Sequence, residues 1–234
     1  MEVVYSASRN LYPYLLPSIM SLLDHNKVDN IYLMIEDDEL PYQVPDVCRC
    51  INVSDQRYFG MDGPNFRSPF TYMALMRSTY TDTLPPDLPR VLQLDVDTII
   101  TDDLTGLWEM PLDDKWLAAC PEYLGKYRPF GPTYYNIGVA LFNLDRIRDD
   151  GIDKAIIHDL QTHFRRFLEQ DAWNFYAVPL GKIADVDVRY NECFATGMTD
   201  HPAIVHYAGF PAWMTMQGLP RGEYLDQYRK YYRT

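Results

Sequence analysis

Two aspartates separated by one residue, Asp95 and Asp97, form the pattern in this sequence that could most directly do chemistry. They close the apolar run Val91-Leu-Gln-Leu94, and together with it they predict a strand over 91–97. Alternate residues of a strand point to the same side, so the two carboxylates could converge on one point. Two hard oxygen ligands there suit Mg²⁺ or Mn²⁺, and such an ion could bind a diphosphate. The pattern therefore predicts a divalent-cation site, with a solvated acidic turn as the alternative.

The segments around this pair alternate between strand and helix patterns. Short apolar runs predict strands at 2–6, 30–36, 50–53, 91–97, 116–120 and 138–143. Helical spacing of apolar residues predicts helices at 17–24, 71–80 and 153–168, with His158 and His163 on the outer sides of the last helix. Gly and Pro punctuate 54–69, which predicts a loop. The β-α-β order implies a mainly parallel sheet with right-handed crossovers, so we expect one α/β domain over 1–234.

Composition excludes several classes of protein. The 234 residues carry a net charge of −12, which opposes a broad nucleic-acid-binding face. No stretch reaches the ~18 apolar residues of a membrane span, and the start lacks the pattern of a signal peptide. The four cysteines are too few and too scattered for a disulfide scaffold. We therefore expect reduced cysteines and a cytoplasmic protein without a transmembrane segment.

Five segments in order resemble the retaining nucleotide-sugar glycosyltransferases of family 8, which include glycogenin and bacterial lipopolysaccharide galactosyltransferases. They fall within residues 3–213 and leave 214–234 as a C-terminal tail. The segments are Val4-Tyr-Ser-Ala-Ser-Arg-Asn-Leu-Tyr12, the approach from Arg77 through Leu84-Pro85 to Asp95-Val-Asp97, Tyr135-Asn-Ile-Gly-Val-Ala-Leu-Phe-Asn143, Glu169-Gln-Asp-Ala-Trp-Asn174 and His206-Tyr-Ala-Gly209. The resemblance implies the family's GT-A fold, a Rossmann-like mixed sheet flanked by helices.

The same resemblance implies a metal site and an activity. Asp95, Asp97 and His206 would hold Mn²⁺, with Mg²⁺ as the other candidate, and two carboxylates with one imidazole suit the six-fold coordination of manganese. The ion would neutralise charge on a departing nucleoside diphosphate. The implied reaction transfers a hexose, glucose or galactose, from a UDP-sugar to an acceptor that the sequence does not identify.

The resemblance also implies roles for individual residues. Glu169, Gln170 and Asp171 would surround the anomeric carbon of the donor sugar, with Arg77 nearby. Gln170 is a poor nucleophile, which favours front-face attack by the acceptor over a covalent intermediate. Tyr12 would stack on or flank the base. The residues expected to bind the donor are Ala7, Ser8, Asn10, Tyr12, Asp95, Val96, Asn136, Gly138 and Gly209.

Two departures from the family pattern leave alternatives open. The first loop has Ser8, Arg9 and Asn10 where the family usually has an aspartate near uracil, and Ala212 replaces a lysine that grips the diphosphate. A second hypothesis is therefore a glycosyltransferase-like domain that binds a nucleotide or glycan without turnover. A third uses Asp95-Val-Asp-Thr98 as the nucleophile motif of a haloacid dehalogenase-like phosphatase.

The partners follow from the same interpretation. We expect a nucleotide-sugar donor, a glycan, lipid-linked or protein acceptor, and no nucleic acid. The basic and aromatic tail at 228–233 is compatible with peripheral membrane contact, although a final helical turn with favourable C-terminal cations accounts for it as well.

Overall fold

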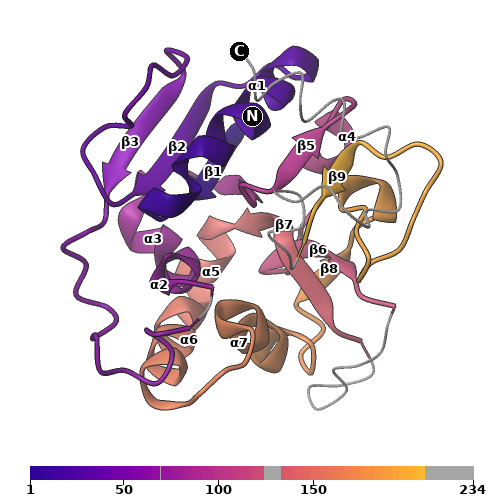
Figure 1. Ribbon diagram of the computed structural model, residues 1–234. Coiled ribbons are helices and arrows are strands. Elements are labelled where there is room, and N and C mark those ends of the chain that lie inside the picture. Colours follow the sequence, from indigo (N-terminus) through magenta and orange to yellow (C-terminus); the bar gives the residue numbers. More distant parts are fainter. Residues whose placement is uncertain (69, 124–132, 209–234) are drawn as a thin grey trace.

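Seven strands form the central sheet of this computed structural model, which describes residues 1–68, 70–123 and 133–208 (Figure 1). Their order across the sheet is β3-β2-β1-β4-β7-β6-β8. β7 runs antiparallel to its neighbours β4 and β6, and the other neighbouring pairs are parallel. The strands are β1 (Glu2–Ser6), β2 (Asn30–Ile35), β3 (Cys48–Asn52), β4 (Arg90–Leu94), β6 (Leu117–Pro121), β7 (Tyr135–Asn143) and β8 (Ile183–Asp185). The expected mixed, mainly parallel α/β sheet is confirmed.

A second, two-stranded antiparallel sheet pairs β5 (Thr98–Ile100) with β9 (Ile204–His206). Helical segments cover the sheets and fill the connections between strands. They are η1 (Arg9–Leu11), α1 (Tyr12–His25), α2 (Tyr72–Leu75), η2 (Met76–Thr79), α3 (Tyr80–Thr83), α4 (Thr105–Trp108), α5 (Leu144–Asp150), α6 (Ile152–Thr162), α7 (Leu168–Ala177) and η4 (Val188–Tyr190). No helix of the described residues is long and apolar enough to cross a bilayer.

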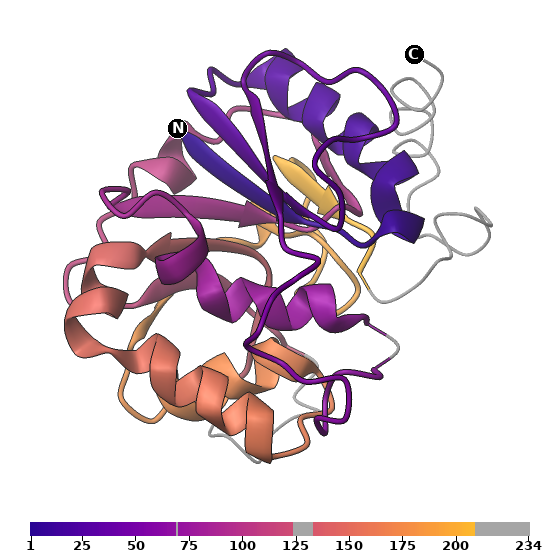
Figure 2. The same cartoon turned by 90° about the vertical axis from the view of Figure 1, so that its left-hand side faces the viewer.

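The central sheet separates two apolar cores, because alternate strand residues point to opposite faces. Val3 enters the core under α1, whereas its neighbour Val4 enters the core that also contains residues of α5, α6 and α7. Figure 2 shows α1 on one side of the sheet and α2, α6 and α7 on the other. Buried strands in such a three-layer arrangement read as continuous apolar runs, as the sequence of β7 does.

The expected single helix over 153–168 is wrong. α6 ends at Thr162, and α7 starts at Leu168, whose φ of 50° breaks the helical path. Asn65 accounts for the break, since its amide donates to the carbonyls of Leu160 and His163 at 2.6 and 2.7 Å. Phe164, which lies in the segment between the two helices, is 70% exposed. His158 and His163 are exposed, as expected.

Other helices and strands begin or end at residues that differ from the predicted ones. α1 begins at Tyr12 rather than 17 and contains Pro17, while the helix expected at 71–80 is divided into α2, η2 and α3. β3 begins at Cys48 rather than 50. The four cysteines all lie in the described part of the chain, and none forms a disulfide.

Asn174 fastens α7 to the central sheet. Its carboxamide exchanges two hydrogen bonds with the backbone of Tyr135, at 2.7 and 2.9 Å, and is fully buried. Replacing it by leucine (Asn174→Leu) leaves both backbone groups without these partners, so we expect the free energy of unfolding to fall by about 2–4 kcal/mol. Urea unfolding followed by circular dichroism measures this change. A loss below about 0.5 kcal/mol would show that α7 is held by its apolar contacts alone.

Candidate functional site

The two aspartates lie in a tight turn between β4 and β5, not on a strand. β4 ends at Leu94, and the N–H and Oγ1 of Thr98 both donate to the carbonyl of Asp95, at 3.2 and 2.8 Å. The prediction that the strand reaches Asp97 is therefore wrong, although the carboxylates still converge. Thr98 is in turn hydrogen-bonded to Ser18 of α1 at 3.0 Å, so this helix supports the turn from the adjoining core.

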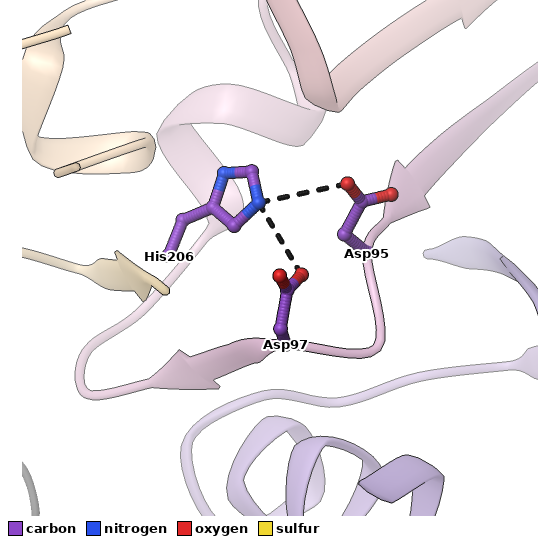
Figure 3. Close-up of side chains that lie close together, drawn as sticks. All are labelled: Asp95, Asp97 and His206. Atoms are coloured by element: carbon purple, nitrogen blue, oxygen red, sulfur yellow. Dashed lines mark ion pairs between the residues drawn. The ribbon is translucent and has the colours of Figure 1, made fainter. Parts of the chain in front are cut away.

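Strand pairing brings the third residue to this turn. In the β5–β9 register, Thr98 lies opposite His206, and the N–H of Tyr207 donates to the carbonyl of Asp97 at 2.9 Å. His206 Nε2 is 3.5 Å from Asp95 Oδ2 and 3.3 Å from Asp97 Oδ1 (Figure 3). Ligand atoms of the three residues lie within 4.8 Å of one another. The expected trio is thus assembled from segments more than 100 residues apart.

Charge and burial of this trio favour a cation-binding site. The His206 side chain is 2% exposed, whereas both aspartate side chains are 19% exposed, which leaves a route from solvent. Burial opposes ionisation of His206, but the carboxylates of Asp97 and Asp95 prevail and raise its pKa well above the ordinary value. Burial likewise opposes ionisation of Asp97, yet the charge of His206 lowers its pKa. The carboxylates and the imidazole therefore favour one another's charged forms.

Gly138 leaves the space in which Asp95 and His206 approach each other. It lies within β7, not in a turn before that strand, and its carbonyl accepts from the N–H of Asp95 at 2.8 Å. A Cβ at this position would lie 2.3 Å from His206 Cε1 and 2.6 Å from Asp95 Oδ2. Only glycine fits here without displacing a ligand.

Arg77 connects the trio to α7. Its guanidinium is 2.6 Å from Asp95 Oδ1 and 3.1 Å from Glu169 Oε1, and the side chain is 16% exposed. Burial opposes its charge, but the two carboxylates prevail and raise the pKa of Arg77 further. Because Oδ1 of Asp95 faces Arg77, Oδ2 is directed toward His206. Arg77 is therefore part of the buried centre and not a helix-surface ion pair.

The three residues at the start of α7 have different surroundings. Glu169 Oε2 is buried and has no hydrogen-bond partner among the described residues. Gln170 accepts from the N–H of Ile137 at 3.0 Å and donates to the Tyr134 hydroxyl at 3.1 Å. Asp171 accepts from that same hydroxyl at 2.6 Å and from the N–H of Phe167 at 3.0 Å. Of the three, Glu169 retains a free acceptor.

The first loop lies at the end of β1. Ala7 and Ser8 are buried, and Ser8 donates to the side chain of Asn10 at 2.6 Å. Arg9 makes two hydrogen bonds to Asp37, each 2.9 Å, and Tyr12 donates to the same carboxylate at 2.9 Å. Tyr12 is 4% exposed, so its expected contact with a base stays a prediction. Gly209, Ala212 and the tail at 228–233 lie outside the described residues.

Three polar residues escaped the sequence analysis. Tyr134 bridges Gln170 and Asp171, Glu122 accepts from Asn136 at 3.2 Å, and Asn191 contacts His206 Nδ1 at 2.8 Å. None of them lies in a segment that the family resemblance used. Their only sequence signal is a polar side chain beside an apolar run, which is too common to single them out.

The donor set fits a hard divalent cation. Neighbouring ligands of an octahedral Mg²⁺ lie about 3 Å apart, from bond lengths of about 2.0–2.1 Å, and the nitrogen–oxygen distances of 3.3 and 3.5 Å approach that spacing. Two carboxylates and one imidazole suit Mn²⁺ as well. Asp95, Asp97 and His206 are the residues that would hold it.

Comparison with known proteins agrees with this fold. The model of the family "Glycosyl transferase family 8" matches residues 2–216, so the chain belongs to that family. The central sheet and its flanking helices are those of the GT-A fold. The family assignment contradicts the phosphatase hypothesis.

The chain is also similar to individual glycosyltransferases, in sequence and in fold. The chain is 30% identical to "Probable galacturonosyltransferase-like 2" of Arabidopsis thaliana over 149 residues, 53% of this chain and 43% of that protein. It thus spans less than half the length of this relative. The structure of galactosyltransferase LgtC with donor and acceptor sugar analogs superposes with a TM-score of 0.71 at 20% identity, covering 100% of this chain and 95% of that one. A structure of an LgtC active-site mutant gives 0.75 at 19% identity, covering 98% and 95%.

The space at Gly138 can be tested directly. Gly138→Ala places a methyl group against Asp95 and His206, so we expect Mn²⁺ affinity to fall more than about 10-fold, as for other losses of ligand geometry. Electron paramagnetic resonance titration of Mn²⁺ measures the affinity. Gly60→Ala is the matched control, because nothing lies within 4 Å of a Cβ there. Equal Mn²⁺ affinities for the two variants would show that Asp95 and His206 can move apart without weakening metal binding.

Burial of Glu169 predicts a pH dependence of stability. Burial is the largest influence and raises its pKa from 4.5 to about 7, although Arg77 opposes the rise. Since the folded protein holds this proton more tightly, the stabilisation is complete below the unfolded pKa and is lost as pH rises through about 7. We expect wild-type stability in EDTA to fall relative to Glu169→Gln by on the order of 3 kcal/mol between about pH 5 and pH 8. Parallel stability curves would show that Glu169 is ionised throughout.

Proposed function

We propose that this chain is a metal-dependent retaining glycosyltransferase that transfers a hexose, glucose or galactose, from a UDP-sugar to an acceptor. The observation that carries the proposal is the convergence of Asp95, Asp97 and His206 against Gly138, in a chain of glycosyl transferase family 8. A nucleotide-sugar donor and a glycan acceptor are the substrates of such a reaction. The structure of LgtC with donor and acceptor sugar analogs supports this choice of substrate class.

The metal centre would bind the diphosphate of the donor. A Mn²⁺ or Mg²⁺ ion held there would supply Lewis-acid stabilisation of the charge on the leaving diphosphate. Arg77 holds Oδ1 of Asp95 at 2.6 Å, which directs the other oxygen toward the ion position. Through Glu169 it also links that position to α7, so the metal site and the sugar site share one rigid connection.

The start of α7 would line the reacting centre. Glu169 Oε2, which is buried, is available to accept a hydrogen bond from a donor-sugar hydroxyl. Gln170 and Asp171 are held in place by Tyr134, and a preorganised carboxylate near the anomeric carbon would stabilise an oxocarbenium-like transition state. Gln170 remains a poor nucleophile. The acceptor then attacks from the face that the diphosphate leaves, and a phosphate oxygen takes its proton.

The first loop would meet the base. Ala7, Ser8, Asn10 and Tyr12 belong to this loop and the helix start that follows it, whereas Asn136 and Gly138 of β7 would line the sugar pocket. Arg9 is engaged by Asp37 through two hydrogen bonds. Because Arg9 is paired with Asp37, it is not free to bind the diphosphate in place of the lysine that Ala212 replaces. The cytoplasmic location and the membrane contact of 228–233 remain predictions.

The engagement of Arg9 favours one second candidate, a family member that binds a donor without turnover. Hydrolysis of a UDP-sugar in the presence of Mn²⁺ separates the two proposals. Release of UDP would exclude the candidate without turnover. Mn²⁺-dependent binding of UDP with no release of the sugar would favour it.

Asp97→Ala tests the proposed function. Removing one of the two carboxylates should abolish Mn²⁺-dependent stabilisation by the cognate nucleotide and lower UDP-sugar hydrolysis by more than about 100-fold. Thermal shift with UDP, GDP, ADP, CDP and their sugars, UDP-galacturonic acid included, reports binding in wild type and variant. Asp87→Ala, at an exposed position, is the control and should match wild type. Full activity of Asp97→Ala would refute the metal assignment.

A further inference from the structure

Two side chains, Asn136 and Asn191, connect the backbone of β7 to the back of the His206 ring. The N–H of Gly138 donates to Asn136 Oδ1 at 3.1 Å, and Asn191 Nδ2 donates to the same oxygen at 3.0 Å. Asn136 Nδ2 donates in turn to Glu122 Oε1 at 3.2 Å. At the other end, Asn191 Oδ1 lies 2.8 Å from His206 Nδ1. The side chain of Asn191 is fully buried.

Among the donors in this series of hydrogen bonds, only the backbone N–H of Gly138 has its identity fixed by covalent structure. A backbone N–H can only donate, so the Asn136 atom facing it must be the oxygen. The Asn191 atom facing that oxygen must then be the amide nitrogen. Consequently the oxygen of Asn191 faces His206, and Nδ1 of the imidazole must carry a hydrogen to bond to it.

We propose that Asn191 is a positioning residue of the metal centre, which keeps a proton on His206 Nδ1 and thereby leaves the Nε2 lone pair free for a divalent cation. The orientation is set by the backbone of Gly138 and transmitted through Asn136. A rotated Asn191 amide would place two oxygens against each other at Asn136. The inference rests on the metal centre of the proposed function, and it identifies Asn191 as the residue that orients one of the ligands of that centre.

The backbone around Asn191 is built to hold this contact. Its own N–H donates to the carbonyl of Val188 at 3.0 Å, and its carbonyl accepts from the Thr196 hydroxyl. The next residue, Glu192, accepts from the N–H of His206 at 2.9 Å and donates to the carbonyl of Ile204 at 3.0 Å. Asn191 and His206 are therefore held in register by main-chain hydrogen bonds, independently of their side-chain contact.

Two substitutions separate positioning from packing. Asn191→Leu removes the acceptor at Nδ1, and we expect Mn²⁺ affinity to fall about 10–100-fold, the range for lost partners of metal-bound histidines. Asn191→Asp keeps an acceptor at Nδ1 while losing the donor to Asn136, so its affinity should stay within about threefold of wild type. Paramagnetic resonance titration with Mn²⁺ alone gives the affinities. Thermal unfolding in EDTA shows whether each variant is folded.

Asn65→Leu is the matched control, because Asn65 is equally buried and bonds backbone groups beside α6, away from the metal trio. It should lose stability without losing Mn²⁺ affinity. Wild-type affinity in Asn191→Leu would overturn the proposal, and so would a loss in Asn191→Asp as large as in Asn191→Leu. If wild type itself binds no Mn²⁺, the metal centre of the proposed function fails instead.

A measurement on the unaltered protein covers the case in which neither Asn191 variant folds. Nitrogen-15 spectra of histidine-labelled, Cd²⁺-loaded protein report which ring nitrogen of His206 carries the proton. We expect a protonated Nδ1 and a metal-bound Nε2. The reverse assignment would overturn the proposal.

Discussion

The close approach of the Asp95 and His206 side chains to the backbone of Gly138 is the constraint on which the rest of the site depends. A Cβ there would overlap both Asp95 and His206, so the trio can exist only where β7 carries no side chain. β7 is also the antiparallel strand between β4 and β6, and it presents Asn136 two residues earlier. One strand therefore supplies the space for the ligands and the first member of the amide chain behind them.

Buried charge is the second organising feature. Arg77, Glu169, Asp95, Asp97 and His206 form one continuous group of ionisable side chains beside the carboxyl end of β4. Removing such charges from water is costly unless each is paired. Pairing raises the pKa of His206 and lowers the pKa of Asp97, whereas burial raises the pKa of Glu169 against the opposing influence of Arg77. A divalent cation added to this group would meet carboxylates that are already oriented. That preorganisation is what a diphosphate-binding centre requires.

Several structural expectations failed for a common reason. The helix over 153–168 was interrupted because Asn65, about 100 residues earlier, bonds the carbonyls of Leu160 and His163. Asp95 and Asp97 converge through a turn closed by Thr98, and not through the alternation of a strand. In both cases the local apolar pattern was sound, but a hydrogen bond from a polar residue decided where the element ended. Such bonds have no periodicity that a sequence could display.

By itself the sequence determined the α/β class and most strands of the central sheet, because apolar runs are local properties. The ordered family segments also singled out Asp95, Asp97 and His206, which the fold brings together. The tertiary structure alone decided how Thr98 pairs with His206, why residue 138 must be glycine, and which atom of His206 faces the carboxylates. Glu122, Asn136 and Asn191 acquire their roles only through contacts between distant segments. The physical reason is that the direction of a hydrogen bond depends on the partner across space, which no residue encodes in its own neighbourhood.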